Sequence, residues 1–191
     1  MSKSNLQIVI SDSSVIPDWL PNEMKSNVVL SSDVHLKSKG TVYLEYIVNN
    51  YHSLPDYVLF VNSDPFKTCL LSREKFIDAL INEPCILYDR SAWNQCLKCL
   101  GDGRPHHPGL EITEWFSRLF PGQAAPQVFD FIAGSQFLYS KERLLSNPKS
   151  FYETILQYTI KNELNDYILE RLWNVIINGV QKQGAAPGNM I

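Results

Sequence analysis

The chain has 191 residues, a formal net charge of −3 and 19% charged residues, which are values of an ordinary globular domain. It has no block of basic residues that would neutralise phosphates, so we expect no nucleic-acid partner. No stretch approaches the ~18 consecutive apolar residues of a membrane span, and the N-terminus lacks the apolar core of a signal peptide, so we expect a soluble, cytoplasmic protein.

Short apolar or β-rich runs predict three strands early in the chain, at residues 6–10, 27–30 and 57–62. Before the third run, apolar residues recur at helical spacing over 41–53, with Thr41 as the expected N-cap. Strand, helix and strand in this order predict a βαβ crossover. The third run is apolar without a break as far as Val61, which predicts a central strand buried on both faces.

Later helices are predicted to begin at Ser72 and Ser140 and to cover 111–120, 151–161 and 166–178. Residues 85–88 and 127–132 are predicted strands, whereas proline and glycine make 100–109 a loop. The alternation predicts an α/β fold with a mostly parallel central sheet flanked by helices. We expect a single domain over 1–182 and a flexible tail over 183–191.

Asp64 is the first candidate for a functional residue, because it lies just past the end of the apolar strand and precedes Pro65. Proline cannot donate to a sheet ladder, so the strand ends there and the carboxylate lies at its carboxyl end. Open α/β sheets bind ligands at that edge. The alternative is that Asp64 serves only as a turn former.

Four cysteines are expected to be free thiols in a reducing compartment. Cys96 and Cys99 precede His106 and His107, which permits a zinc-site interpretation. Adjacent histidines seldom point at one metal ion, so the alternative is that the two cysteines pack as small residues in a helix or a loop.

Three segments resemble one known pattern. They are residues 43–66, residues 134–144 (Gly-Ser-Gln-Phe-Leu-Tyr-Ser-Lys-Glu-Arg-Leu) and residues 167–173 (Tyr-Ile-Leu-Glu-Arg-Leu-Trp). Together they resemble the DUF3431 family, which is similar to nucleotide-sugar glycosyltransferases of the GT-A type. The resemblance covers most of residues 40–180 and implies a GT-A-like, Rossmann-like domain.

The resemblance implies transfer of a sugar from a nucleotide-sugar donor to a hydroxyl acceptor such as a glycan. In the GT-A fold, an Asp-x-Asp motif after a central strand holds a divalent cation that neutralises the leaving diphosphate. This chain has Asn62-Ser63-Asp64 at that position. The implied roles are catalysis and Mn²⁺ or Mg²⁺ binding for Asp64, with help from the Asn62 amide oxygen.

Glu170 and Arg171 lie in the third segment, on a predicted helix. The resemblance implies that Glu170 is a catalytic carboxylate that faces the acceptor or the donor sugar, with Arg171 beside it in the substrate site. The alternative is a solvent-facing glutamate that pairs with a cation, since charged residues are mostly exposed.

The remaining candidates are neutral or basic groups that suit a sugar diphosphate. Gly134, Ser135 and Gln136 offer close backbone approach and neutral hydrogen bonds, unless they form an ordinary turn. Arg104 and His107 can supply donors to the diphosphate, unless they belong to a flexible loop.

One departure from the family keeps rival interpretations open. Relatives carry Gly-Arg-Glu before the first helix, where this chain reads Lys37-Ser38-Lys39. That departure and the half-present acidic motif favour a non-catalytic carbohydrate-binding or interaction protein, whereas the Glu170 segment favours the transferase. A third interpretation is a small zinc-stabilised module that uses Cys96 and Cys99.

Overall fold

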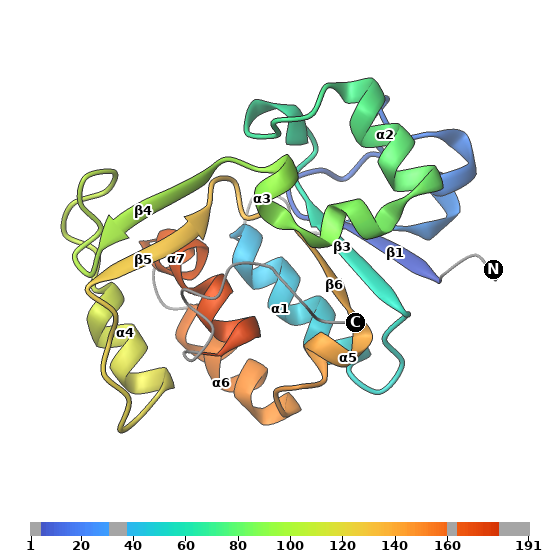
Figure 1. Ribbon diagram of the computed structural model, residues 1–191. Coiled ribbons are helices and arrows are strands. Elements are labelled where there is room, and N and C mark those ends of the chain that lie inside the picture. The colour runs from blue at the N-terminus through green and yellow to red at the C-terminus, as the bar shows by residue number, and fades with distance from the viewer. Residues whose placement is uncertain (1–4, 31–37, 160–163, 180–191) are drawn as a thin grey trace.

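The computed structural model describes residues 5–30, 38–159 and 164–179, and this part of the chain folds around a four-stranded sheet (Figure 1). The strand order is β2, β1, β3, β6, with bounds Val28–Leu30, Leu6–Ile10, Tyr57–Val61 and Phe137–Ser140. β1, β2 and β3 are parallel, whereas β6 runs antiparallel to β3. The predicted α/β architecture with a mostly parallel sheet is confirmed.

Helices cover both faces of this sheet (Figure 1). One face is covered by α1, α6 and α7 and the other by α2, with bounds Lys39–Asn50, Lys149–Thr159, Leu164–Asn178 and Arg73–Asn82. The side chains of β3 alternate between two cores: Val58 and Phe60 pack in the first, Leu59 and Val61 in the second. The prediction that this strand is central and buried is therefore confirmed.

A two-stranded antiparallel sheet extends to one side of the central sheet (Figure 1). It consists of β4 (Cys96–Leu100) and β5 (Val128–Ile132), with α4 (Ile112–Leu119) between them in the chain. α7 packs against both β5 and α4, so it joins this sheet to the central one. The short helices are η1 Asn22–Asn27, η2 Pro65–Lys67, η3 Pro84–Tyr88, α3 Arg90–Trp93 and α5 Lys141–Leu144.

Two local predictions were wrong. Residues 85–88 form η3 rather than a strand, because Pro84 begins a helical turn in which the Ile86 N–H donates to the Glu83 carbonyl. The N-cap of α1 is Ser38 rather than Thr41, since the Ser38 hydroxyl accepts the Thr41 N–H and lets the helix begin earlier. The expected tail over 183–191 lies outside the described residues.

Two strands have no counterpart in the sequence predictions. Residues 96–100 form β4, where a helix or a loop was expected, because each of them pairs with a residue of β5 about thirty positions further on. Residues 137–140 form β6, which pairs with β3 across more than seventy residues. No helix in the described ranges is both long and apolar enough to span a bilayer.

The double burial of β3 gives a direct test of the fold. Leu59→Ala should lower the free energy of unfolding by about 2–5 kcal/mol, because the side chain is 0% exposed and its removal leaves a cavity. Leu70→Ala is the matched control, since Leu70 is 64% exposed and the change should stay within about 0.5 kcal/mol. Urea unfolding measures both, and similar losses would contradict the assigned core.

Candidate functional site

Residues that follow the parallel strands β1 and β3 meet at one edge of the sheet. Asp12 follows β1, and its Oδ1 accepts a hydrogen bond from the Ser63 backbone N–H at 2.6 Å. Asn62 follows β3, is buried, and donates from Nδ2 to the Gly134 carbonyl at 3.0 Å. Open α/β sheets bind ligands at this edge, so we take it as the candidate site.

The turn before β6 reaches the same edge because β6 is antiparallel and begins opposite the end of β3. Gly134 and Ser135 both have positive φ angles, of 82° and 54°. A Cβ atom on Gly134 would lie 2.8 Å from Thr68 Oγ1 and 3.3 Å from Asn62 Nδ2. Glycine is therefore required here by the backbone angle and by the close neighbours together.

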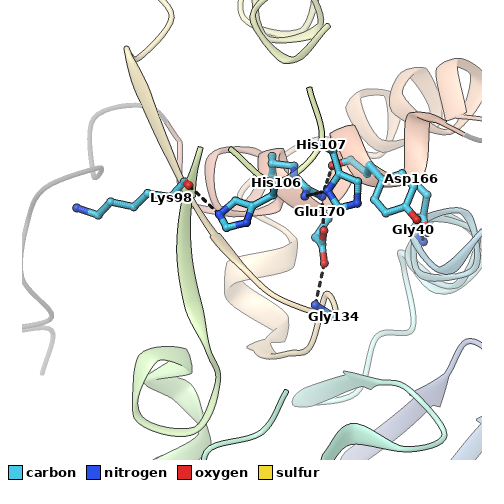
Figure 2. Close-up of polar contacts among 9 residues, drawn as sticks. Gly40, Lys98, His106, His107, Gly134, Asp166 and Glu170 are labelled. Carbon is cyan, nitrogen blue, oxygen red and sulfur yellow. Dashed lines mark hydrogen bonds and ion pairs between the residues drawn. The ribbon is translucent and has the colours of Figure 1, made fainter. Parts of the chain in front are cut away.

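Glu170 projects from α7 onto this turn (Figure 2). Its Oε1 accepts the Gly134 backbone N–H at 2.7 Å, and its Oε2 accepts a hydrogen bond from the Arg171 guanidinium. The side chain is 17% exposed. Glu170 thus lies inside the site rather than on the open surface of the helix.

Arg171 is the buried charge of the site, with a side chain that is 1% exposed. Its guanidinium donates to Glu170, to the Tyr167 carbonyl at 2.9 Å and to His107 Nδ1 at 2.8 Å. It also lies over the Phe131 ring, 4.4 Å from the centroid. A carboxylate, a carbonyl, an imidazole and an aromatic face replace part of the water that the buried guanidinium loses, while Arg171 Nε has no hydrogen-bond partner in the described part of the chain.

His107 reaches α7 from the loop between β4 and α4, and its ring stacks on Tyr167 with centroids 4.3 Å apart. Because a guanidinium can only donate, Nδ1 must accept and the ring proton is on Nε2. Partial burial, followed by the positive charge of Arg171, lowers the pKa of His107 and so favours this neutral form. His106 turns elsewhere, with its Nε2 3.2 Å from the Lys98 carbonyl (Figure 2).

Gln136 and Ser135 are buried, so their groups face the protein interior. Gln136 Nε2 donates to the Pro65 carbonyl at 3.1 Å and to Thr68 Oγ1 at 2.8 Å. Within the described part of the chain, Gln136 Oε1 and Asn62 Oδ1 have no hydrogen-bond partner. The bonds that Gln136 does make tie the turn before β6 to the segment after β3.

Asp64 and Arg104, two of the predicted site residues, have partners elsewhere. The Asp64 side chain is 53% exposed, and its Oδ2 lies 3.7 Å from Lys67 Nζ. Arg104 pairs with Asp102 at 2.6 Å and lines an open hollow of about 430 Å³ between the end of β4 and the start of α4. The hydrogen-bonded group that the structure does bring together is Asn62, Gly134, Glu170, Arg171 and His107.

For a divalent cation, the Asn62-Ser63-Asp64 segment supplies one carboxylate, that of Asp64, and Asp12 lies nearby with its Oδ1 accepting the Ser63 N–H. Across the described ranges, no group of three or more His, Cys, Asp and Glu side chains is arranged to hold a metal ion. Magnesium-type sites can take one or two protein carboxylates plus substrate phosphates. Mn²⁺ or Mg²⁺ therefore stays a prediction, and no step proposed below passes through it.

The zinc interpretation does not match the geometry of its proposed ligands. Cys96 and Cys99 lie three residues apart on β4, so their side chains point to opposite faces, and Cys96 is exposed while Cys99 is buried. His106 and His107 turn toward different partners, as described above. The four side chains cannot converge on one ion in this arrangement.

Three residues that shape this edge were missed from the sequence. Asp12, like Asp64, is a carboxylate that lies just past the end of an apolar strand, so the same sequence pattern could have identified it. Tyr43 accepts a hydrogen bond from Ser11 Oγ at 3.3 Å, and burial strongly raises its pKa. Asp166 accepts the Gly40 N–H at 2.8 Å across 126 residues, a contact without any local signal (Figure 2).

The close packing at Gly134 yields a prediction with a matched control. Gly122 has nearly the same φ angle, 81°, but no atom lies within 4 Å of its potential Cβ. Gly122→Ala should therefore show only the left-handed backbone cost of about 1–2 kcal/mol, whereas Gly134→Ala should lose clearly more. Chemical denaturation checks this, and equal losses would show that the contacts with Thr68 and Asn62 relax freely.

Comparison with known proteins places the chain in a family. A family model described as "Protein of unknown function (DUF3431)" matches residues 92–187, just over half of the chain. The match spans the turn at 134–136 and Glu170, but it begins after Asp64 and so covers less than the resemblance over 40–180. Searches of curated proteins and of solved structures gave no match. The chain belongs to the DUF3431 family.

Proposed function

We propose that this protein is a GT-A-like glycosyltransferase that moves a sugar from a nucleotide-sugar donor to a hydroxyl acceptor. The observation that carries the proposal is the hydrogen-bonded group at the sheet edge, in which Glu170 is fixed between Gly134 and Arg171. A carboxylate at the ligand-binding edge of an α/β sheet suits a general base. The choice of reaction is supported by the resemblance of the three sequence segments to the DUF3431 family, taken with the expected similarity of that family to GT-A enzymes.

In the proposed reaction, Glu170 takes the proton of the acceptor hydroxyl while the acceptor oxygen bonds to the anomeric carbon of the donor. The bond from that carbon to the diphosphate breaks, and the diphosphate leaves with the electron pair. Each carboxylate oxygen has two lone-pair sites, so the bonds to Gly134 and Arg171 leave one on each oxygen for the acceptor. The same bonds fix the orientation of the carboxylate before the acceptor arrives.

Of the three basic residues predicted for the site, Arg171 is buried, whereas Arg104 and His107 are exposed. Arg171 is too deeply buried to reach a diphosphate, so its role in the proposal is to hold Glu170 and His107. Arg104 has a side chain that is 62% exposed, and His107 is also exposed. These two residues can donate to the phosphates of the donor.

A second candidate function is a non-catalytic carbohydrate-binding or interaction protein on the same fold. One observation favours it: both oxygens of Glu170 already have protein partners, and little of the side chain is exposed. A carboxylate held in this way also serves as a structural tie between α7 and the turn before β6. Turnover separates the two functions, because both predict binding of a sugar ligand.

Binding of the donor is the first measurable consequence. Nucleotide diphosphates and nucleotide sugars should raise the melting temperature, with about 2.7 kcal/mol of stabilisation at ~100 times the dissociation constant. If Asp64 holds a cation, Mn²⁺ should add to this effect in the wild type but not in Asp64→Ala. Stabilisation that is equally Mn²⁺-dependent in both proteins would remove Asp64 from the metal site, and no stabilisation by any nucleotide would contradict the proposed donor.

Glu170→Gln tests the proposed base. The change keeps the size of the side chain but removes its basicity, so turnover at saturating substrates should fall by about 10²–10⁴-fold. It also leaves Arg171 without its anionic partner, which should destabilise the protein toward the lower end of about 3–5 kcal/mol. Initial rates must therefore be measured well below the melting temperature of the variant.

The matched control is Glu142→Gln, since Glu142 is an exposed glutamate on the short helix α5. It should retain wild-type turnover. A Glu170→Gln protein that is folded and turns over at the wild-type rate would exclude Glu170 as the base. A wild-type protein that binds nucleotide sugars but transfers to no acceptor would support the non-catalytic function.

A further inference from the structure

A cavity of about 200 Å³ adjoins the candidate site, and the proposed transfer assigns it no role so far. Asn174, on one wall, lies four residues after Glu170 on α7, and residues at this spacing are neighbours on one face of a helix. Ile132, on another wall, ends β5 two residues before Gly134, the partner of Glu170. The cavity therefore opens about one helical turn from the proposed base.

Charged groups from separate elements converge around Cys96, which lines this cavity. Burial raises the pKa of the Cys96 thiol, and the charges of Arg90, Asp89 and Asp130 all act on it. Arg90 also acts on the buried hydroxyl of Tyr139 in β6, since burial raises the pKa of Tyr139 and the Arg90 charge opposes the rise. Arg90 itself is half-buried and lines the cavity.

The lining combines hydrogen-bond donors, acceptors and apolar surface. Arg90 and the Asn174 amide nitrogen can donate, and the carboxylate of Asp130 can accept. The Ser91 hydroxyl donates to Asp89. Phe131 and Ile132 of β5 contribute apolar surface. Phe131 also contacts the candidate site, because the Arg171 guanidinium lies over its ring.

These features select one class of ligand. Arg90 in the lining and Lys98 beside Asp130 are balanced by the carboxylates of Asp89 and Asp130, so the cavity lacks the excess positive charge that favours an anion. No side-chain cluster for a metal ion exists in the described ranges. A neutral ring with several hydroxyl groups uses donors, acceptors and apolar surface at once. The cavity is smaller than the ~300–1,000 Å³ pockets that bind drug-sized ligands, so it has room for one such ring.

We propose that this cavity is a monosaccharide subsite in which Asp130, Asn174 and Arg90 bind the hydroxyl groups of the sugar unit that accepts the transferred residue. The acceptor role rests on the proposed transfer, whereas the binding of a sugar ring rests on the lining alone. Asn174 lies one helical turn from Glu170, so the proposed subsite is close to the proposed base.

Cys96 provides a reporter, because it is an exposed residue that lines the cavity. The full-length protein is treated with N-ethylmaleimide in the presence of glucose, galactose, mannose or N-acetylglucosamine, and peptide mass spectrometry follows each cysteine. At ten times its dissociation constant, a sugar that fills the cavity should slow labelling of Cys96 about tenfold. Labelling of Cys69, which is not among the lining residues of the cavity, should not change.

Variants of the lining show whether the protection comes from this cavity. Asp130→Asn and Asn174→Ala should abolish the protection of Cys96, whereas Asp78→Asn, an exposed position on α2, should keep it. Asp130 has a half-exposed side chain paired with Lys98 at 3.8 Å, so its replacement should leave the fold intact, which circular dichroism checks. Protection that persists in both lining variants, or no protection by any of the four sugars, would overturn the subsite.

Failure of the subsite and failure of the transferase give different results. Transfer activity without sugar protection of Cys96 would overturn the subsite and leave the proposed reaction standing. Protection that needs Asp130 and Asn174, in a protein without transfer activity, would support the subsite as a sugar-binding cavity and overturn its acceptor role.

Discussion

A guanidinium buried inside the protein has to be neutralised, and the whole region around the sheet edge is arranged by that requirement. Arg171 is supplied by α7 and takes its anion from the preceding residue, Glu170. Removing one partner of a buried ion pair typically costs about 3–5 kcal/mol, so the pair is kept together. Further hydrogen bonds from Glu170 and Arg171 then fix segments that are distant in the sequence.

Two segments contact the Glu170–Arg171 ion pair, the turn before β6 and the loop after β4. Glu170 uses its second oxygen to hold the Gly134 N–H, and the Gly134 carbonyl in turn receives the amide of Asn62. On the other side, Arg171 holds the loop after β4 through His107. The carboxylate proposed as a base is thus also the residue on which the local packing depends, so activity and stability are coupled at one side chain.

Much of the framework could be predicted from the sequence, because the patterns involved are local. The unbroken apolar run of β3 predicted its burial on both faces, and helical spacing located α1, α4, α6 and α7. β4 and β6 were missed because their pairing partners lie far along the chain. The burial of Arg171 was missed for the same reason, since one of its partners is 64 residues away and arginine is usually exposed.

The antiparallel direction of β6 has a consequence for how this family can vary. The chain leaves the sheet after Val61 and returns at Phe137, and these two points lie side by side at the same edge. The segment between them, residues 62–136, includes the β4–β5 sheet and α4. Its two ends are held together by the pairing of β3 with β6. The exposed loops of this segment can lengthen or shorten in a relative without shifting the strands of the central sheet. The recognition of partners is thereby free to diverge while the central scaffold stays the same.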